Sequence, residues 1–161
     1  AIPGNHEYYA DYASWMKAYR ALGLTMLENA HVLIHRDGSP LAVAGLTDRQ
    51  AVSFGQPAPD RELALQGVPS GVPVILLDHR PGNAVANARS GVALQLSGHT
   101  HGGQILGPHL LTRWANGGFV SGLYQVGAMT LYVSHCAGLW NGLAIRLGKP
   151  SEIAQIVLRA Q

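Results

Sequence analysis

The sequence predicts an α/β fold that contains a mixed sheet or paired sheets. Two runs of branched apolar residues, 72–77 and 92–96, are typical of strands buried on both faces, and a helix is predicted between them over residues 83–89. Strands and helices alternate early in the chain and hairpins dominate late, which favours the α/β class. Hydrophobic residues make up 47% of the 161 residues and charged residues 12%, which suits a largely buried interior.

The first half of the chain predicts one helix and one hairpin. Apolar residues recur at near-helical spacing over residues 10–22, and Gly23 ends that segment. Asp37 and Gly38 are typical of a hairpin turn. Three short strands are predicted around these signals, at residues 24–27, 31–34 and 41–45. Four aromatic residues are predicted to pack the first helix rather than to bind a ligand: Tyr8, Tyr9, Tyr12 and Trp15.

The second half of the chain adds a short helix and a second hairpin. The helix is predicted over residues 60–65, just after Pro57 and Pro59. Gly127 separates the two arms of the hairpin. The strands predicted outside the two buried runs are residues 119–126, 129–134 and 153–158. Neither a repeat nor a low-complexity tract interrupts the chain, so we expect a single domain over residues 1–161.

Charge and cysteine content exclude some classes of function. The net charge is +2 and no run of Lys or Arg occurs, so a nucleic-acid-binding module is not predicted. Cys136 is the single cysteine, which excludes an internal disulfide. No signal peptide or membrane anchor is visible, and the apolar run at residues 72–77 is far too short to cross a bilayer. The sequence leaves the compartment open.

Histidines follow both buried strands. His79 comes after residues 72–77 and His99 after residues 92–96, and ligands of sheet-based α/β folds gather at such strand ends. His101 lies two positions further, in a glycine frame formed by Gly98, Gly102 and Gly103 that lets a ligand approach the backbone. A single histidine at a strand end is more often a polar cap. The framed pair favours a site for zinc, iron or manganese.

The motifs occur in a recognisable order. Gly-Asn-His-Glu at 4–7 is followed by the strand ending in His79 and by Gly-His-Thr-His-Gly-Gly at 98–103. This set resembles the calcineurin-like metallophosphoesterase superfamily. The segments 4–9, 94–104 and 122–124, and the closing segments 146–148 and 150–153, look like a bacterial branch of it whose members are often membrane-associated. The resemblance covers effectively the whole chain.

The resemblance implies a four-layer αββα sandwich of mixed sheets with a two-metal site at the strand ends. It implies that Asn5, His79 and His99 bind one divalent ion and that His101 binds the other, with manganese, iron or zinc as the metal. His6 would be the general acid toward the leaving oxygen, an imidazole role suited to neutral pH. The implied reaction is hydrolysis of a phosphomonoester or phosphodiester by a metal-bound hydroxide.

Part of the family's ligand set is absent from this sequence. An Asp-x-His pair and a bridging Asp precede the Gly-Asn-His-Glu motif in the family, and only residues 1–3 precede it here. We therefore expect the C-terminal portion of a longer enzyme, with the N-terminal half missing. Such a chain would be inactive or weakly active until that half, or another copy, completes the site. Glu7 is expected to support its loop. Residues 134–136 stand where the family has an arginine and a small residue, so the resemblance leaves a substrate contact there open.

Several alternatives stay open at this stage. The chain is either a phosphoesterase, a truncated non-catalytic module that binds a metal or a partner, or a structural α/β domain with incidental histidines. A phosphorylated small molecule or a lipid-type phosphoester is the expected substrate of the enzyme. The fold does not select one of these substrates, because one fold supports many functions.

Overall fold

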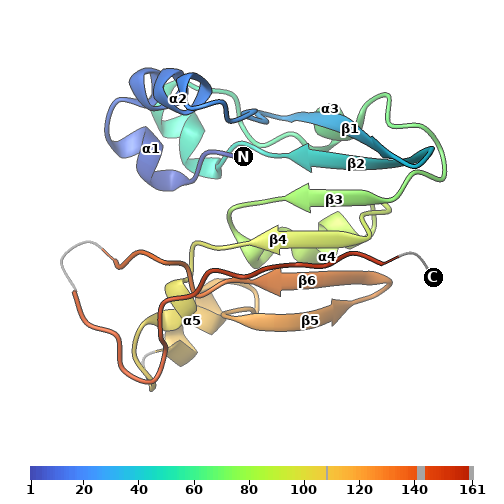
Figure 1. Cartoon of the computed structure of the whole chain (residues 1–161). Coiled ribbons are helices and arrows are strands. Elements are labelled where there is room, and N and C mark those ends of the chain that lie inside the picture. The colour runs from blue at the N-terminus through green and yellow to red at the C-terminus, as the bar shows by residue number, and fades with distance from the viewer. Residues whose placement is uncertain (108, 141–143, 160–161) are drawn as a thin grey trace.

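The computed structural model describes residues 1–107, 109–140 and 144–159, and it confirms the predicted α/β class. Within these residues the strands form one mixed sheet in the order β1-β2-β3-β4-β6-β5 (Figure 1). The strands are β1 (Ala30–Arg36), β2 (Ser39–Gly45), β3 (Val74–Leu77), β4 (Leu94–Ser97), β5 (Gly122–Val126) and β6 (Met129–Val133). Such a sheet is consistent with part of the sandwich that the sequence motifs imply.

The central strands β2, β3, β4 and β6 run parallel, and the edge strands β1 and β5 run antiparallel to their neighbours. The carboxyl ends of the four parallel strands therefore lie at one edge of the sheet (Figure 1). Ala44, Leu76, Gln95 and Leu131 stand in register across these strands, and each is fully buried. This rigid row fixes the positions from which the site loops leave the sheet.

One face of the sheet carries the core. It packs against α3 (Arg61–Leu65) and α4 (Ala84–Ala88), whose Ala64 and Ala84 are buried among the strand residues. Successive residues of a strand point to opposite faces, so the other face is lined by half-buried residues such as Val43 and Ile75. Residues 144–159 run across part of this second face without joining the sheet (Figure 1).

The remaining helical elements are short. They are α1 (Asn5–Tyr9), α2 (Tyr12–Ala21), α5 (His109–Ala115) and the 3-10 turns η1 (Arg49–Phe54), η2 (Pro81–Asn83) and η3 (His101–Gly103). Aspartate side chains cap three of the helical starts by accepting a backbone N–H, which satisfies a donor that has no partner in the helix. These are Asp11 at α2, Asp48 at η1 and Asp60 at α3.

Two predicted strands are wrong. Residues 24–27 pair with no strand in the described part of the chain, although Leu27 is buried and its N–H donates to the Ala1 carbonyl at 2.8 Å. Residues 153–158 also form no strand, and the nearest backbone bond runs from Glu152 N to Cys136 O at 3.1 Å. In the segment 24–27 an apolar residue is buried although the backbone pairs with no strand. The pattern of apolar residues alone does not distinguish such a segment from a strand.

The aromatic residues near the first helices divide into two pairs. Tyr8 is buried and stacks on Tyr12 with ring centroids 4.4 Å apart, so these two pack the helices as predicted. Tyr9 and Trp15 are 53% and 45% exposed, and each still contacts one neighbouring ring, Tyr9 that of Phe54 and Trp15 that of Tyr19. The predicted packing is therefore confirmed for the first pair and only partly met by the second, whose rings lie about half open to solvent.

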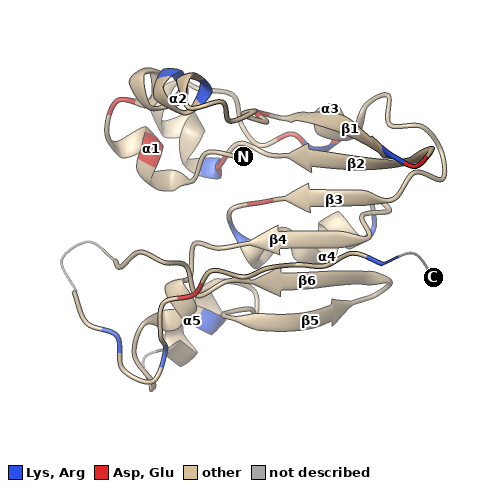
Figure 2. Ribbon diagram, in the orientation of Figure 1, with Lys and Arg blue, Asp and Glu red and all other residues tan. Residues whose placement is uncertain are grey.

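Charged residues lie mainly on loops, turns and the first two helices (Figure 2). The central strands carry almost none, which agrees with the burial of one sheet face. A membrane-crossing segment would require a long apolar helix, and the described residues contain none that qualifies.

Candidate metal centre

The candidate site lies at the carboxyl edge of the parallel strands. His79 follows β3, His99 follows β4, and Asn5 is the first residue of α1, which packs beside η1. Gly4 permits this approach, because a Cβ at that position would lie 2.8 Å from Cε1 of His79. Glu7 Oε2 accepts the Gly4 N–H at 2.8 Å and holds the turn, in line with the supporting role expected for this residue.

Three predicted ligands converge in space. Asn5 Oδ1 lies 2.9 Å from His79 Nε2 and 3.1 Å from His99 Nδ1, and the two imidazole nitrogens are 3.2 Å apart. The parallel pairing of β3 and β4 explains why the two histidines meet, since equivalent strand ends lie side by side. Asn5 arrives from 74 positions away along the chain.

The spacing of these atoms fits a metal ion. Two ligands at right angles around an ion, each bonded at about 2.1 Å, lie about 3.0 Å apart. The three distances match that value, and imidazole nitrogen and amide oxygen suit ions such as zinc, iron and manganese. Burial lowers the pKa of His79 to about 4 and that of His99 to about 3, so both rings are neutral at pH 7. Neutral imidazole is the form that binds metals.

Tyr9 sets the orientation of the Asn5 amide. Asn5 Nδ2 donates to the Tyr9 hydroxyl at 3.3 Å, and that hydroxyl donates to Gln50 Oε1 at 3.3 Å. Because the nitrogen side of the amide is engaged there, the oxygen faces His79 and His99. Sequence reasoning missed this role of Tyr9, and its only signal was the four-residue spacing that places both side chains on one face of a helix.

An ion pair holds the outer side of His99. Arg80 Nε donates to Asp48 Oδ2 at 2.7 Å, and Arg80 Nη1 lies 2.9 Å from His99 Nε2. Asp48 is fully buried and Arg80 is 14% exposed. Guanidinium only donates, so His99 Nε2 accepts here and the proton of the neutral ring lies on Nδ1. Coordination through Nδ1 therefore requires that proton to leave and Arg80 to withdraw from Nε2.

No pattern in the sequence predicts this ion pair between Arg80 and Asp48. Asp48 follows β2 and lies 32 positions from Arg80, so only the packing of two loops reveals the contact. Arg80 has a weak signal in the sequence, because it directly follows His79. A cation beside a predicted ligand is a reason to look for an anion nearby.

His101 stands apart from the other predicted ligands. Its Nδ1 lies 3.1 Å from the Gly138 carbonyl, which fixes the N–H there and leaves the lone pair on Nε2. His99 and His101 both have positive φ, 66° and 51°, so the loop bends sharply at non-glycine residues, a strain typical of functional sites. Within the described residues no three His, Cys, Asp or Glu side chains form a metal-binding group, so His101 has no such partners for a second ion.

His6 lies on α1 next to Asn5, and its side chain is exposed. Its ring meets Tyr9 edge-on at a centroid distance of 5.6 Å. A cavity of about 380 Å³ opens at this ring. His6 thus stands on the same short helix as a predicted ligand, but within the described residues no hydrogen bond joins its side chain to the Asn5–His79–His99 cluster.

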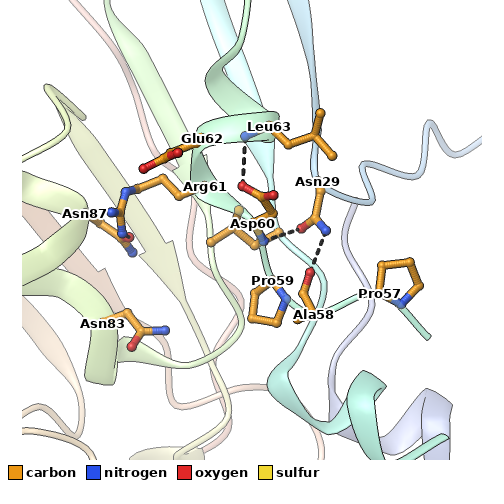
Figure 3. Close-up of a pocket in the computed structure, with 11 residues that line it drawn as sticks. Asn29, Pro57, Ala58, Pro59, Asp60, Arg61, Glu62, Leu63, Asn83 and Asn87 are labelled. Carbon is orange, nitrogen blue, oxygen red and sulfur yellow. Dashed lines mark hydrogen bonds between the residues drawn. The ribbon is translucent and has the colours of Figure 1, made fainter. Parts of the chain in front are cut away.

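A separate polar pocket of about 460 Å³ lies between α3 and η2 (Figure 3). Its wall is held by Asn29, which accepts from Asp60 N at 3.0 Å and donates to the Ala58 carbonyl at 2.7 Å. Arg61 Nη1 donates to Asn87 Oδ1 at 3.2 Å on the other side. None of the predicted site residues lines this pocket, so it is distinct from the candidate centre.

Behind His79, Asp78 is part of a buried polar network. Asn87 Nδ2 donates to Asp78 Oδ2 at 2.9 Å and to Gln95 Oε1 at 3.0 Å. Burial raises the pKa of the Asp78 carboxyl to about 6. These hydrogen bonds satisfy polar groups inside the core and fix the strand end that carries His79.

Two imidazoles and an amide oxygen at the carboxyl edge of a parallel sheet define a candidate metal-dependent hydrolytic centre. The chain is similar to curated proteins named metallophosphoesterases, which is consistent with the calcineurin-like metallophosphoesterase superfamily that its motifs resemble. It is 35% identical over 170 residues to the Bos taurus "Transmembrane protein with metallophosphoesterase domain", a match that covers 99% of this chain and 38% of that protein.

Two bacterial relatives give the same result. The chain is 38% identical over 159 residues to an "Uncharacterized metallophosphoesterase" of Helicobacter pylori, covering 98% of this chain and 41% of that protein. It is 34% identical over 167 residues to the "Uncharacterized metallophosphoesterase YkuE" of Bacillus subtilis. That match covers 99% of this chain and 55% of that protein. The chain thus spans about two fifths to one half of the length of these relatives. No family model and no solved structure matches it.

Proposed function

We propose that this chain carries part of the catalytic centre of a metal-dependent phosphoesterase. The convergence of Asn5 Oδ1, His79 Nε2 and His99 Nδ1 within 3.2 Å of one another is the observation that carries the proposal. The metallophosphoesterase names of the relatives support the same class. The substrate is a phosphomonoester or phosphodiester of a small molecule or a lipid.

The residues of the chain have separate tasks in this proposal. Asn5, His79 and His99 hold one divalent ion, and His101 contributes Nε2 to a second. Ions bound there supply the Lewis acidity that activates water and neutralises charge on the phosphate oxygens. His6 donates a ring N–H proton to the leaving oxygen as its bond to phosphorus breaks. Its exposed position on α1 leaves the ring free to reach a substrate.

The second ion needs ligands beyond the described residues of this chain. His101 alone does not hold a divalent ion firmly, and two close cations repel each other without a bridging carboxylate. We propose that other parts of the complete gene product, or another copy, supply these groups. The isolated chain would then bind metal weakly and turn over little substrate.

The test uses the complete gene product with manganese and with both a phosphomonoester and a phosphodiester substrate. His99→Ala is expected to abolish hydrolysis of both, because it removes a metal ligand. His35→Ala is the matched control, since His35 lies exposed on the edge strand β1, away from the centre. Full hydrolytic activity in His99→Ala would contradict the proposed function.

The alternative of a non-catalytic metal-binding module has one observation in its favour. The described residues contain a partial ligand set and no complete His, Cys, Asp or Glu group. Under this alternative the complete gene product binds a single ion through Asn5, His79 and His99 and hydrolyses neither substrate. The same assay, combined with a count of bound metal, therefore separates the two functions.

A further inference from the structure

A cavity with aromatic walls opens beside His6. It has a volume of about 380 Å³ and is lined by His6, Glu7, Tyr9, Ala10 and Trp15. This volume lies in the range of small-molecule sites. Tyr9 and Trp15 are 53% and 45% exposed, so their rings face the cavity and solvent instead of the core.

Neighbouring rings hold the two aromatic walls in place. Tyr9 meets Phe54 edge-on with centroids 6.1 Å apart, and its hydroxyl bonds Gln50. Trp15 packs against Tyr19 at a centroid distance of 5.5 Å. A supported aromatic ring offers a flat surface for another ring, because offset and edge-on ring pairs attract beyond their burial alone.

The cavity has little to offer a charged group. None of the described lining residues is Lys or Arg. Glu7 is the one charged residue in the lining, and its carboxylate already accepts from Gly4 N at 2.8 Å and from the Tyr19 hydroxyl at 3.1 Å. An anionic occupant would meet this carboxylate without a compensating cation, and a cationic one would compete for oxygens that are already hydrogen-bonded.

The cavity shares one lining residue, His6, with the proposed catalytic centre. A general acid must come within hydrogen-bond reach of the oxygen that it protonates, so the group attached to that oxygen extends past His6. His6 is part of the cavity wall, so a group that extends past His6 can enter the cavity. We propose that this cavity binds the leaving group of the substrate and selects a flat, uncharged aromatic ring. This inference rests on the proposed phosphoesterase function and names the leaving-group chemistry of the same site.

The first test compares benzyl phosphate with cyclohexylmethyl phosphate in the complete gene product with manganese. The two alcohols are alike in size and in leaving-group chemistry, but only one ring is flat. We expect kcat/KM to favour the benzyl ester about fivefold, mainly through KM. Trp15→Ala should bring the ratio close to one, and Trp15→Phe should restore it. Trp114→Ala is the matched control, because Trp114 is 84% exposed on α5.

The second test measures binding without turnover. Benzyl alcohol is titrated into protein with labelled tryptophan indoles, and the Trp15 resonance is followed by NMR. We expect it to shift, with Trp114 unchanged and with a smaller response to cyclohexylmethanol. Hydrolysis whose benzyl preference survives Trp15→Ala, or an unmoved Trp15 resonance, overturns the pocket assignment. A shifted Trp15 resonance without hydrolysis of either ester, or of the phosphodiester substrate used above, supports the pocket and refutes the phosphoesterase.

Discussion

The Asn5–His79–His99 cluster and the His101 loop differ in how completely the chain builds them. The three donor atoms of the cluster lie within 3.2 Å of one another, and the Tyr9 hydroxyl holds the Asn5 amide from behind. The His101 ring contacts the Gly138 carbonyl and meets Trp140 edge-on, and the described residues form no group of three His, Cys, Asp or Glu side chains around it. The proposed first ion site thus has its three donor atoms together in the described residues, whereas the proposed second site would depend on groups that come from elsewhere.

The largest expected difference between these regions is in metal affinity. His99→Ala should weaken manganese binding by the complete gene product at least a hundredfold, because it removes a direct ligand from the preorganised site. His101→Ala should leave one tight site and lower the number of bound ions. Calorimetric titration gives both the affinity and the stoichiometry. An equal loss of manganese affinity in His99→Ala and His101→Ala would contradict the proposed difference between the two regions.

A smaller effect is expected from the group that orients the amide. Tyr9→Phe removes the hydroxyl that accepts from Asn5 Nδ2, so the amide is free to rotate its oxygen away from the histidines. We expect manganese affinity to fall about tenfold, as is typical for an outer-shell hydrogen bond. Tyr124→Phe provides the control, because its hydroxyl bonds backbone N–H groups of residues 120 and 121. An unchanged affinity in Tyr9→Phe would show that packing alone fixes the amide.

The smallest effect is a pH dependence of the metal-free cluster. Burial lowers the folded-state pKa of His99 to about 3, so its contribution to stability is present above the unfolded pKa of about 6.5 and is lost as pH falls below it. Wild type should therefore lose stability relative to His99→Gln over this window, by at most about 1.4 kcal/mol per pH unit. Urea unfolding at several pH values measures the difference.

Other groups at the site titrate in the same window. His79, with its pKa lowered to about 4, acts in the same direction as His99. Asp78 acts in the opposite direction, because burial raises its pKa to about 6 and its protonation stabilises the fold as pH falls. Comparison with His99→Gln cancels both contributions to first order. A difference that stays flat from pH 7 to pH 4 would contradict the burial of His99.

The placement of His79 and His99 was accessible from the sequence for a physical reason. A continuous branched apolar run predicts a strand buried on both faces, and adjacent parallel strands end at one edge. Asn5 was expected at the same site because of the family resemblance. The contacts of Asp48 with Arg80 and of Asn5 with Tyr9 were not accessible, because they depend on side-chain directions in loops that meet only after folding.

The segments 24–27 and 153–158 show where prediction from sequence patterns failed. Both have the apolar composition of strands, yet neither pairs with a strand in the described part of the chain. A strand forms only where a neighbouring strand has free backbone N–H and C=O groups to pair with. Amino-acid composition indicates only the tendency of the side chains to be buried. Local patterns therefore predicted the central sheet well and the peripheral segments poorly.

Position 4 shows how little tolerance the site has. An added methyl group there would lie 2.8 Å from an imidazole carbon, so alanine is already too large. The added carbon would push the Asn5 amide away from the His79 ring, which lies 74 positions further along the chain, without removing any polar atom. Replacing Gly4 with alanine would therefore disrupt the site although every predicted ligand residue would still be present in the sequence.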